Sequence, residues 1–199
     1  MKKGENYNHP KKGSKTKVMP IKRLKDVKTI KKMLVNEPRN YALFVMGINT
    51  ALKASDLARL TVADVRHLKH GDILEIVKKR SGKKRPVPLN KACTKAIARL
   101  IEAEDLKDDD PLFKSRKKGG RLTVQSIHRL VKGWCRAINL SGNYGSHTLR
   151  KTFGYHRRVT FGRSVTELRK LFGHNSKQAT IDYLCLQSDN GKEIFMDEL

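Results

Sequence analysis

Residues 146–183 set the tightest limits on this chain, because they place two histidines, an arginine and a tyrosine at defined spacings. His147 and Arg150 are three positions apart, so both side chains lie on one face if a helix begins here, and both can donate to one phosphate. His174 follows a glycine that marks an expected helix end. A turn just after it would fold Tyr183, nine positions further on, back toward the histidines. This arrangement predicts a site for attack on a phosphodiester.

The charge of the chain indicates its partner. Lys and Arg number 44 of the 199 residues against 19 Asp and Glu, which gives a formal net charge of +25. A compact fold with this self-repulsion favours an anionic partner, so we expect nucleic acid, with an anionic membrane surface as the rival. The sequence has no apolar run of about 18 residues, the length that a membrane-spanning helix needs. We therefore expect one soluble, cytoplasmic domain with no membrane partner.

The cysteines and the clustered acids do not predict a metal site. Cys93, Cys135 and Cys185 are widely spaced and lack a Cys-x-x-Cys pattern, so we expect reduced, mostly buried thiols. Residues 108–110 are three adjacent aspartates, whose spacing fits a solvated loop better than a metal site. We expect no metal ligands.

Apolar residues at helical spacing predict a mainly α-helical fold. Asn90 and Thr123 mark helix starts, and Ser164 with Glu167 forms a capping box. The expected helices begin at Pro20, Tyr41, Asn90, Thr123, Ser146 and Ser164, and the first of them ends near Glu37. Residues expected to face the core are Leu24, Val27, Ile30, Leu34, Ile127, Trp134, Leu168, Leu171 and Phe172.

A small sheet completes the expected α+β fold. Residues 73–77 and 85–89 have the composition of two strands, joined by a turn that contains Gly82. Residues 1–19 are rich in lysine, which predicts a flexible basic arm that is either only solvated or follows DNA phosphates. Residues 20–199 then form one domain that includes a C-terminal tail, 187–199.

Three short motifs in this chain resemble those of the tyrosine recombinases, the phage integrase family. They are His147-Thr-Leu-Arg150, Leu171-Phe-Gly-His174 and Tyr183. The resemblance implies the family's catalytic domain, a DNA breaking-rejoining enzyme fold that is mainly α with a small antiparallel β-sheet. It also implies that Tyr183 is the nucleophile, and that His147, Arg150 and His174 bind the phosphate.

Residues 49–57 resemble the first box of the family, Gly-Leu-Arg-x-Ser-Glu-Leu, with one departure. Lys53 stands where the family has an arginine, and Asp56 matches its acidic position. A guanidinium makes two parallel hydrogen bonds to phosphate while an ammonium acts as a point charge, so this exchange is not conservative. The resemblance implies a catalytic role for both residues, with Asp56 orienting a histidine or holding a cation of the phosphate cradle.

The resemblance also gives the hairpin between the two strands a catalytic lysine, eight residues before the proline of the second strand. Counting back from Pro88 gives Arg80, whose guanidinium does not readily release a proton. Lys79 and Lys83 flank it and would serve as the acid if the hairpin shifts by a residue. The remaining hairpin cations, and a basic pair further along, are expected to bind DNA: Lys78, Lys84, Arg85, Lys117 and Lys118.

The resemblance implies a site-specific DNA recombinase, an integrase or invertase of a mobile element, that works through a 3′-phosphotyrosine. Such an enzyme needs no cofactor and acts on double-stranded DNA as a homo-oligomer, a tetramer, associated with a bacterial or phage-type nucleoid. The alternative is a DNA-binding relative that Lys53 and Arg80 have weakened or inactivated. A topoisomerase with similar tyrosine chemistry also fits the motifs.

Overall fold

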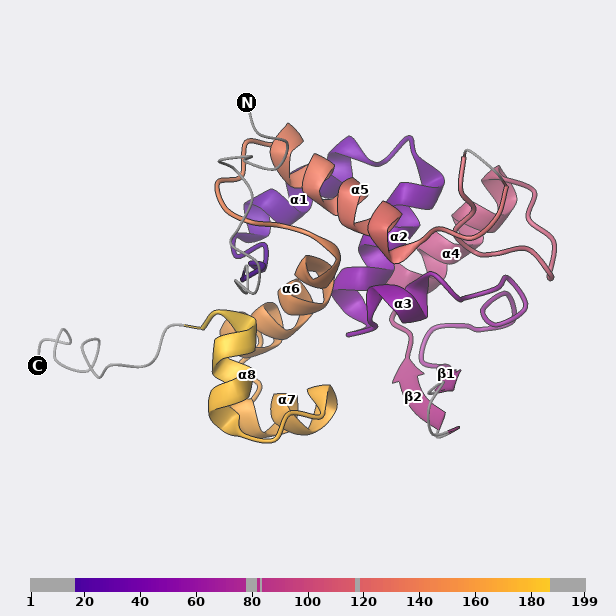
Figure 1. Cartoon of the computed structure of the whole chain (residues 1–199). Helices are drawn as coiled ribbons and strands as arrows, with labels where there is room; N and C mark the ends of the chain where they lie inside the picture. Colours follow the sequence, from indigo (N-terminus) through magenta and orange to yellow (C-terminus); the bar gives the residue numbers. More distant parts are fainter. Residues whose placement is uncertain (1–16, 78–81, 83, 117–118, 187–199) are drawn as a thin grey trace, which may run out of the picture.

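The computed structural model describes residues 17–77, 82, 84–116 and 119–186. Within these residues the fold is mainly α-helical with one two-stranded antiparallel sheet, as predicted (Figure 1). The elements are α1 (Leu24–Met33), α2 (Pro38–Asn49), α3 (Ala54–Leu57), β1 (Ile73–Val77), β2 (Lys84–Pro88), α4 (Lys91–Ala103), α5 (Val124–Ala137), α6 (Ser146–Val159), α7 (Val165–Phe172) and α8 (Lys177–Leu184).

The three helix starts predicted at Asn90, Thr123 and Ser164 are confirmed, and each has a capping side chain. The side chain of Asn90 accepts a hydrogen bond from the backbone N–H of Cys93 at 3.0 Å, and Thr123 caps α5 in the same way. Ser164 and Glu167 form the expected capping box at the start of α7. Each cap satisfies a backbone N–H that the first helical turn leaves without a partner.

The first helix is shorter than predicted, because residues 18–21 are bound to α6 instead. The backbone N–H of Ile21 donates to the hydroxyl of Thr152 at 2.9 Å, and the hydroxyl of Thr148 donates to the carbonyl of Met19 at 2.9 Å. Leu24 therefore begins the helix, and it is 48% exposed rather than buried. The division of the chain at residue 20 stays a prediction, and residues 1–16 lie outside the described residues.

Two other expectations were wrong in detail. The second strand is β2, Lys84–Pro88, one residue earlier than predicted. Lys84 pairs with Val77 at the turn end of the hairpin, whereas Leu89 lies beyond the last residue of the strand, although its N–H still donates to the carbonyl of Asp72. Leu171 is 45% exposed. Since α7 has only eight residues, a single stripe of Leu168 and Phe172 packs inward, and Leu171 lies beside it.

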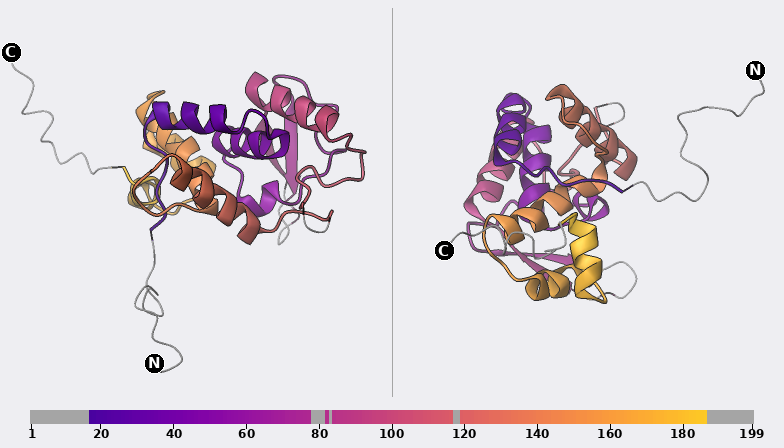
Figure 2. Two further views of the ribbon diagram at one scale, coloured as in Figure 1. Left: turned by 90° about the horizontal axis from the view of Figure 1, so that it is seen from above. Right: turned by 90° about the vertical axis from the view of Figure 1, so that its left-hand side faces the viewer.

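Two hydrophobic clusters each include a residue of α6, Leu149 in the larger one and Phe153 in the smaller one. The larger one surrounds α2, which is buried along most of its length as predicted and packs against α4 and α6. It includes Trp134, and the buried thiols of Cys93 and Cys135, whose burial raises the pKa of each to about 12. The smaller cluster holds α7 and α8 together at one side of the helical body (Figure 2). Its buried members are Ala51, Phe153, Leu168, Phe172 and Leu184.

The three cysteines are free, as predicted. Among the described residues there is no group of three or more His, Cys, Asp or Glu side chains placed to hold a metal ion. In the same part of the chain, no helix has both the length and the apolar character needed to cross a membrane.

Gly154 lets α6 approach α8 closely, which predicts the effect of a methyl group there. A Cβ at this position would lie 2.5 Å from Leu184 Cδ2 and 2.7 Å from Phe172 Cζ. We expect Gly154→Ala to lower the free energy of unfolding by about 1–3 kcal/mol through overpacking, as measured by denaturant titration. The matched control is Gly133→Ala in α5, where a Cβ meets nothing within 4 Å. That change should raise stability by up to about 1 kcal/mol, because alanine favours helix.

Candidate active site

The start of α6 positions two of the predicted site residues. Gly145 precedes the helix, and its backbone N–H donates to the hydroxyl of Thr148 at 3.0 Å. His147, in the first turn, is exposed, whereas Arg150 is only 5% exposed. The helix therefore places an accessible imidazole beside a buried guanidinium.

Arg150 lies at the centre of the site. Its Nη1 donates to the carbonyl of Ala51, its guanidinium carbon is 4.7 Å from the centre of the Phe172 ring, and it lies close enough to the phenol of Tyr183 for each group to shift the pKa of the other. Burial lowers the pKa of Arg150, an effect that Tyr183 and Asp56 oppose. The guanidinium thus joins three parts of the chain, the segment before α3, the end of α7 and helix α8.

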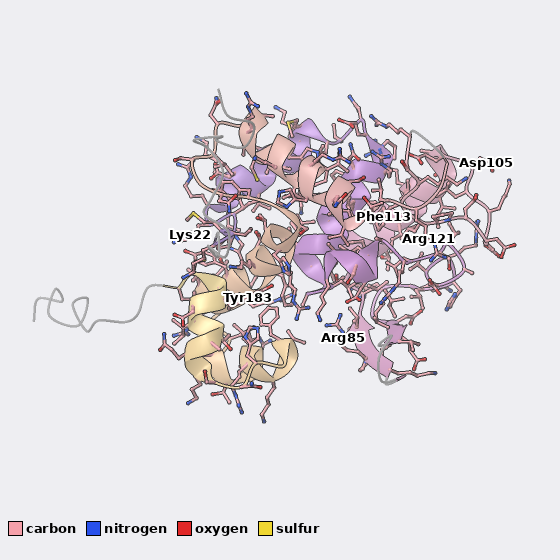
Figure 3. The ribbon with its side chains drawn as sticks, in the orientation of Figure 1. Lys22, Arg85, Asp105, Phe113, Arg121 and Tyr183 are labelled. Atoms are coloured by element: carbon pink, nitrogen blue, oxygen red, sulfur yellow. The ribbon has the colours of Figure 1, made fainter. Side chains whose placement is uncertain are left out.

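Tyr183 reaches Arg150 from α8, which the chain enters after the turn that follows His174. Figure 3 shows its ring on the inner side of α8. The ring centre is 5.0 Å from that of His174 and 5.5 Å from that of Phe172. Burial raises the pKa of the phenol, while the neighbouring Arg150 guanidinium acts in the opposite direction. The expected fold-back of the tyrosine is therefore present, and the resting phenol carries its proton at neutral pH.

Two contacts, one with Phe172 and one with Thr180, hold His174 in place. Gly173 ends α7 in the left-handed conformation, with φ of 70°, which turns the chain so that His174 stacks on Phe172 at 5.5 Å. Its Nδ1 is 3.0 Å from the hydroxyl of Thr180. Burial, and then the charge of Arg150, lowers the pKa of His174.

His147 is also biased toward its neutral form. Although the residue is exposed, partial desolvation of its ring lowers its pKa, and the neighbouring charges of Lys151, Arg150 and Lys53 lower it further. Both histidines are thus uncharged near neutral pH, so each can accept a proton as well as donate a hydrogen bond.

Asp56 holds cations and does not contact either histidine in the ion pairs and hydrogen bonds of the described residues. One carboxylate oxygen is 3.0 Å from Arg59 Nη2, and the other is 3.6 Å from Arg85 Nη2. The same carboxylate accepts from the backbone N–H of Lys53 at 3.2 Å, which caps α3. Two roles were expected for Asp56, orienting a histidine or holding a cation. The structure supports the second, and the cations that Asp56 holds are Arg59 and Arg85. The side chain of Lys53 is exposed.

The hairpin is only partly described. Six of the residues expected to act in catalysis or DNA binding lie outside the described residues, namely Lys78, Lys79, Arg80, Lys83, Lys117 and Lys118. Lys84 is exposed and pairs with Glu75 across the sheet at 2.5 Å. Arg85, in contrast, turns toward Asp56 and is only 20% exposed. The DNA-binding roles of this group stay predictions.

Two residues at the site had not been singled out from the sequence. The ammonium of Lys151 is 4.8 Å from the centre of the Tyr183 ring and donates to the carbonyl of Val18 at 2.7 Å. The other is Thr180, the partner of His174. Thr180 lies six positions after His174, a separation that a short turn followed by one helical turn would bring together. For Lys151, the only feature of the sequence that could have indicated a place in the site is its position next to Arg150.

The fold and this constellation define a class of protein. A tyrosine close to a buried arginine, with two neutral imidazoles beside it, has the parts that a tyrosine-type DNA strand transferase needs. Residues 11–189 match the model of the phage integrase family. The chain therefore belongs to the phage integrase family, whose relatives below are named as recombinases or integrases.

Curated relatives agree with this assignment. The chain is 31% identical over 181 residues to the probable integrase/recombinase YoeC of Bacillus subtilis, which covers 89% of this chain and 95% of that protein. It is 32% identical over 149 residues to the tyrosine recombinase XerC of Caldanaerobacter subterraneus, covering 73% of this chain and 40% of that protein. The chain thus spans nearly all of YoeC but less than half of this XerC.

Solved structures show the same fold. XerA recombinase superimposes with a TM-score of 0.70 at 22% identity, over 94% of this chain and 65% of that one. XerH recombinase bound to a palindromic difH substrate gives a TM-score of 0.67 at 20% identity, over 91% of this chain and 53% of that one. The predicted DNA breaking-rejoining fold is therefore confirmed. The family match and the relatives named as recombinases do not favour the alternative of a DNA-binding relative without activity.

Proposed function

We propose that this chain is a site-specific recombinase that cleaves one strand of double-stranded DNA through Tyr183. The observation that carries the proposal is that Arg150, His174 and Tyr183 gather around one ring, that of Phe172: the guanidinium carbon of Arg150 is 4.7 Å from its centre, and the ring centres of His174 and Tyr183 are each 5.5 Å from it. His147 lies one helical turn before Arg150 on α6. A scissile phosphate bound between Arg150 and Tyr183 would accept from the guanidinium and lie next to the phenol oxygen.

The reaction is a transfer of a phosphoryl group between oxygens. The phenol oxygen attacks phosphorus, a bond forms between them, and the bond from phosphorus to the 5′ oxygen breaks. The phenol proton passes to His147 or His174, and an acid of the hairpin, Lys79 or Lys83, protonates the departing 5′ oxygen. Arg150, Lys53 and the histidines stabilise the charge of the transition state. The phosphotyrosine keeps the energy of the broken ester, so a 5′ hydroxyl of another strand can reverse the step.

The proposed partner is duplex DNA, bound by a tetramer of this chain. The formal charge of +25 supports an anionic partner. Among the structural neighbours, XerH is bound to its difH substrate after cleavage, the Tn1549 transposon integrase is bound to circular intermediate DNA, and a lambda integrase dimer is bound to a core site. The proposal includes a cytoplasmic location at the nucleoid, which the bacterial relatives support.

A covalent trapping experiment tests the proposal. Purified full-length chain is incubated with a pool of nicked duplexes whose central positions are randomised, so that the cleaved fragment diffuses away and the adduct persists. We expect protein–DNA adducts that survive denaturation, that enrich a defined sequence, and that map to Tyr183 by peptide mass spectrometry. Tight binding without an adduct would support the DNA-binding alternative. An adduct on another residue would contradict the assigned nucleophile.

The lowered histidine pKa values predict how the rate depends on pH. Above those values both imidazoles are neutral and can accept the phenol proton, and below them they are protonated and cannot. The rate of adduct formation on an enriched duplex should therefore fall as the medium becomes acidic, with its midpoint below 6.5, the ordinary histidine value. Duplex binding over the same pH range is the control. A midpoint at or above 7 would argue against the histidines as proton acceptors.

A further inference from the structure

Arg85 is placed unlike the other cations of the hairpin. It lies in β2 opposite Ile76 of β1, and Figure 3 shows it on the side of the hairpin that faces the body of the molecule. Its Nη2 is buried and has no hydrogen-bond partner among the described residues, since the nearest Asp56 oxygen is 3.6 Å away. A buried donor without a partner costs about 1–3 kcal/mol. A buried donor left in this state calls for an explanation, and a catalytic role or a bound anion is one.

The surroundings of Arg85 call for an anion. Its charge contributes to the lowered pKa of Arg150, so the two guanidinium groups lie close enough to repel each other. Asp56 is the carboxylate between α3 and the hairpin, and it also pairs with Arg59 at 3.0 Å. One carboxylate among these three arginines leaves two positive charges without compensation. A phosphate diester beside Arg85 and Arg150 would supply both a negative charge and the missing acceptor.

The residue at position 53 does not supply a guanidinium to bind the phosphate. The motif that residues 49–57 resemble has an arginine there, whereas this chain has Lys53, whose ammonium offers no planar pair of donors. The side chain of Lys53 is exposed, and among the described residues Lys53 donates a hydrogen bond through its backbone N–H. Arg85 reaches the same side of α3 from β2 and contacts the Asp56 carboxylate that caps this helix.

We propose that Arg85 is a further catalytic residue, whose guanidinium binds a non-bridging oxygen of the scissile phosphate beside Arg150 and takes the part of an arginine at position 53. Asp56 is then a positioning residue that holds the Arg85 side chain against α3. The inference deepens the proposed function and rests on it. It assigns to β2 a contact with the reacting group, in addition to the acid that the hairpin turn supplies.

The first test compares two arginines that share one carboxylate. With the duplex enriched by trapping, Arg85→Gln should slow single-turnover adduct formation about 100-fold, the usual loss for one donor to a developing oxyanion. The matched control Arg59→Gln removes the same charge from the other side of Asp56 and should leave the rate within about threefold of the unaltered chain. Equal losses in both variants would show that Arg85 acts only on Asp56, and would overturn the inference.

A substrate with an uncharged phosphate distinguishes a direct contact between Arg85 and the phosphate from a role of Arg85 in folding. A duplex with a methylphosphonate at the scissile position lacks one charged oxygen, so a cation that serves that oxygen becomes dispensable. The deficit of Arg85→Gln should shrink from about 100-fold to less than about tenfold on this substrate. A deficit that stays unchanged would mean a structural role and would overturn the inference. Arg85→Lys, which keeps the stem and the charge, replaces Arg85→Gln if thermal unfolding shows that the glutamine variant does not fold.

A second substitution tests the link to position 53. Adding Lys53→Arg to Arg85→Gln should recover at least about tenfold of the lost rate, because it restores a guanidinium to the cradle. If the rate did not recover, that result would count against the inference that Arg85 takes the part of an arginine at position 53. If the unaltered chain forms no adduct, and Arg85→Gln binds duplex as tightly as the unaltered chain does, the proposed function itself is contradicted. If the unaltered chain reacts and Arg85→Gln reacts equally fast, only the present inference fails.

Discussion

Replacing Tyr183 by phenylalanine is expected to abolish covalent attachment to DNA while leaving the fold and duplex binding nearly unchanged. The phenylalanine ring keeps the contacts of Tyr183 with His174 and Phe172, and the ammonium of Lys151 keeps an aromatic face at about the same distance. Only the phenol oxygen is lost, and with it the one atom that can bond to phosphorus. The effect on the rate should therefore be complete.

The same variant should change stability little. It loses the phenol hydroxyl beside the Arg150 guanidinium, a polar contact with a charged group that is worth at most about 1.5–3 kcal/mol. Burying a hydroxyl costs desolvation that phenylalanine does not incur, so part of that loss is offset. Trapping with the enriched duplex measures the adduct, and gel shift measures binding. Tyr144→Phe, which removes a buried hydroxyl that bonds to the Ser141 carbonyl, is the matched control and should react normally.

Residual adduct in Tyr183→Phe would mean that another nucleophile acts. Loss of duplex binding together with the adduct would mean that the phenol contributes to recognition as well as to chemistry. Either result would contradict the role assigned to α8, whereas loss of the adduct alone supports it.

Local sequence signals predicted most of the helices, because each cap is decided by a few neighbouring residues. Asn90, Thr123 and Ser164 each satisfy backbone groups within the next three positions, so a window of four residues contains the whole cause. Leu24 and Leu171 were assigned to the core by periodicity, and both are exposed. What decides their burial is whether another element covers that side, which periodicity does not record.

The site was predictable to a similar extent. The motifs placed His147, Arg150, His174 and Tyr183 in one region, and the structure brings them together through the close approach of α6 and α8. Arg85 was assigned to DNA binding because it follows a run of basic residues. Its inward direction depends on the strand register and on Asp56, 29 positions earlier in the chain, and such a long-range pairing leaves no pattern in a single sequence.

Arg150→Gln is expected to lose activity and stability together, unlike Tyr183→Phe. The arginine is buried and joins the Ala51 carbonyl, the Phe172 ring and the Tyr183 phenol. Glutamine is shorter and uncharged, so it cannot span all three. We expect adduct formation to fall by at least about 1,000-fold, since the main cation of the cradle is lost. We also expect the free energy of unfolding to fall by about 2–4 kcal/mol, because buried polar groups lose their partners.

The stability loss should be concentrated where Arg150 makes its contacts. Ala51 has a φ of 54°, in the left-handed region that a residue with a Cβ adopts at a cost, and its carbonyl is fixed by Arg150. Without that bond the segment before α3 and helix α8 should exchange amide hydrogens faster, while α4 and α5 stay protected. The matched control is Arg157→Gln on the same helix, whose guanidinium stacks on Phe153 and Phe161 at 5.0 and 5.2 Å. It removes an equal charge and a similar stacking contact. If that control lost the adduct as fully as Arg150→Gln, the loss would reflect the charge of α6 as a whole, and Arg150 would have no special place at the phosphate.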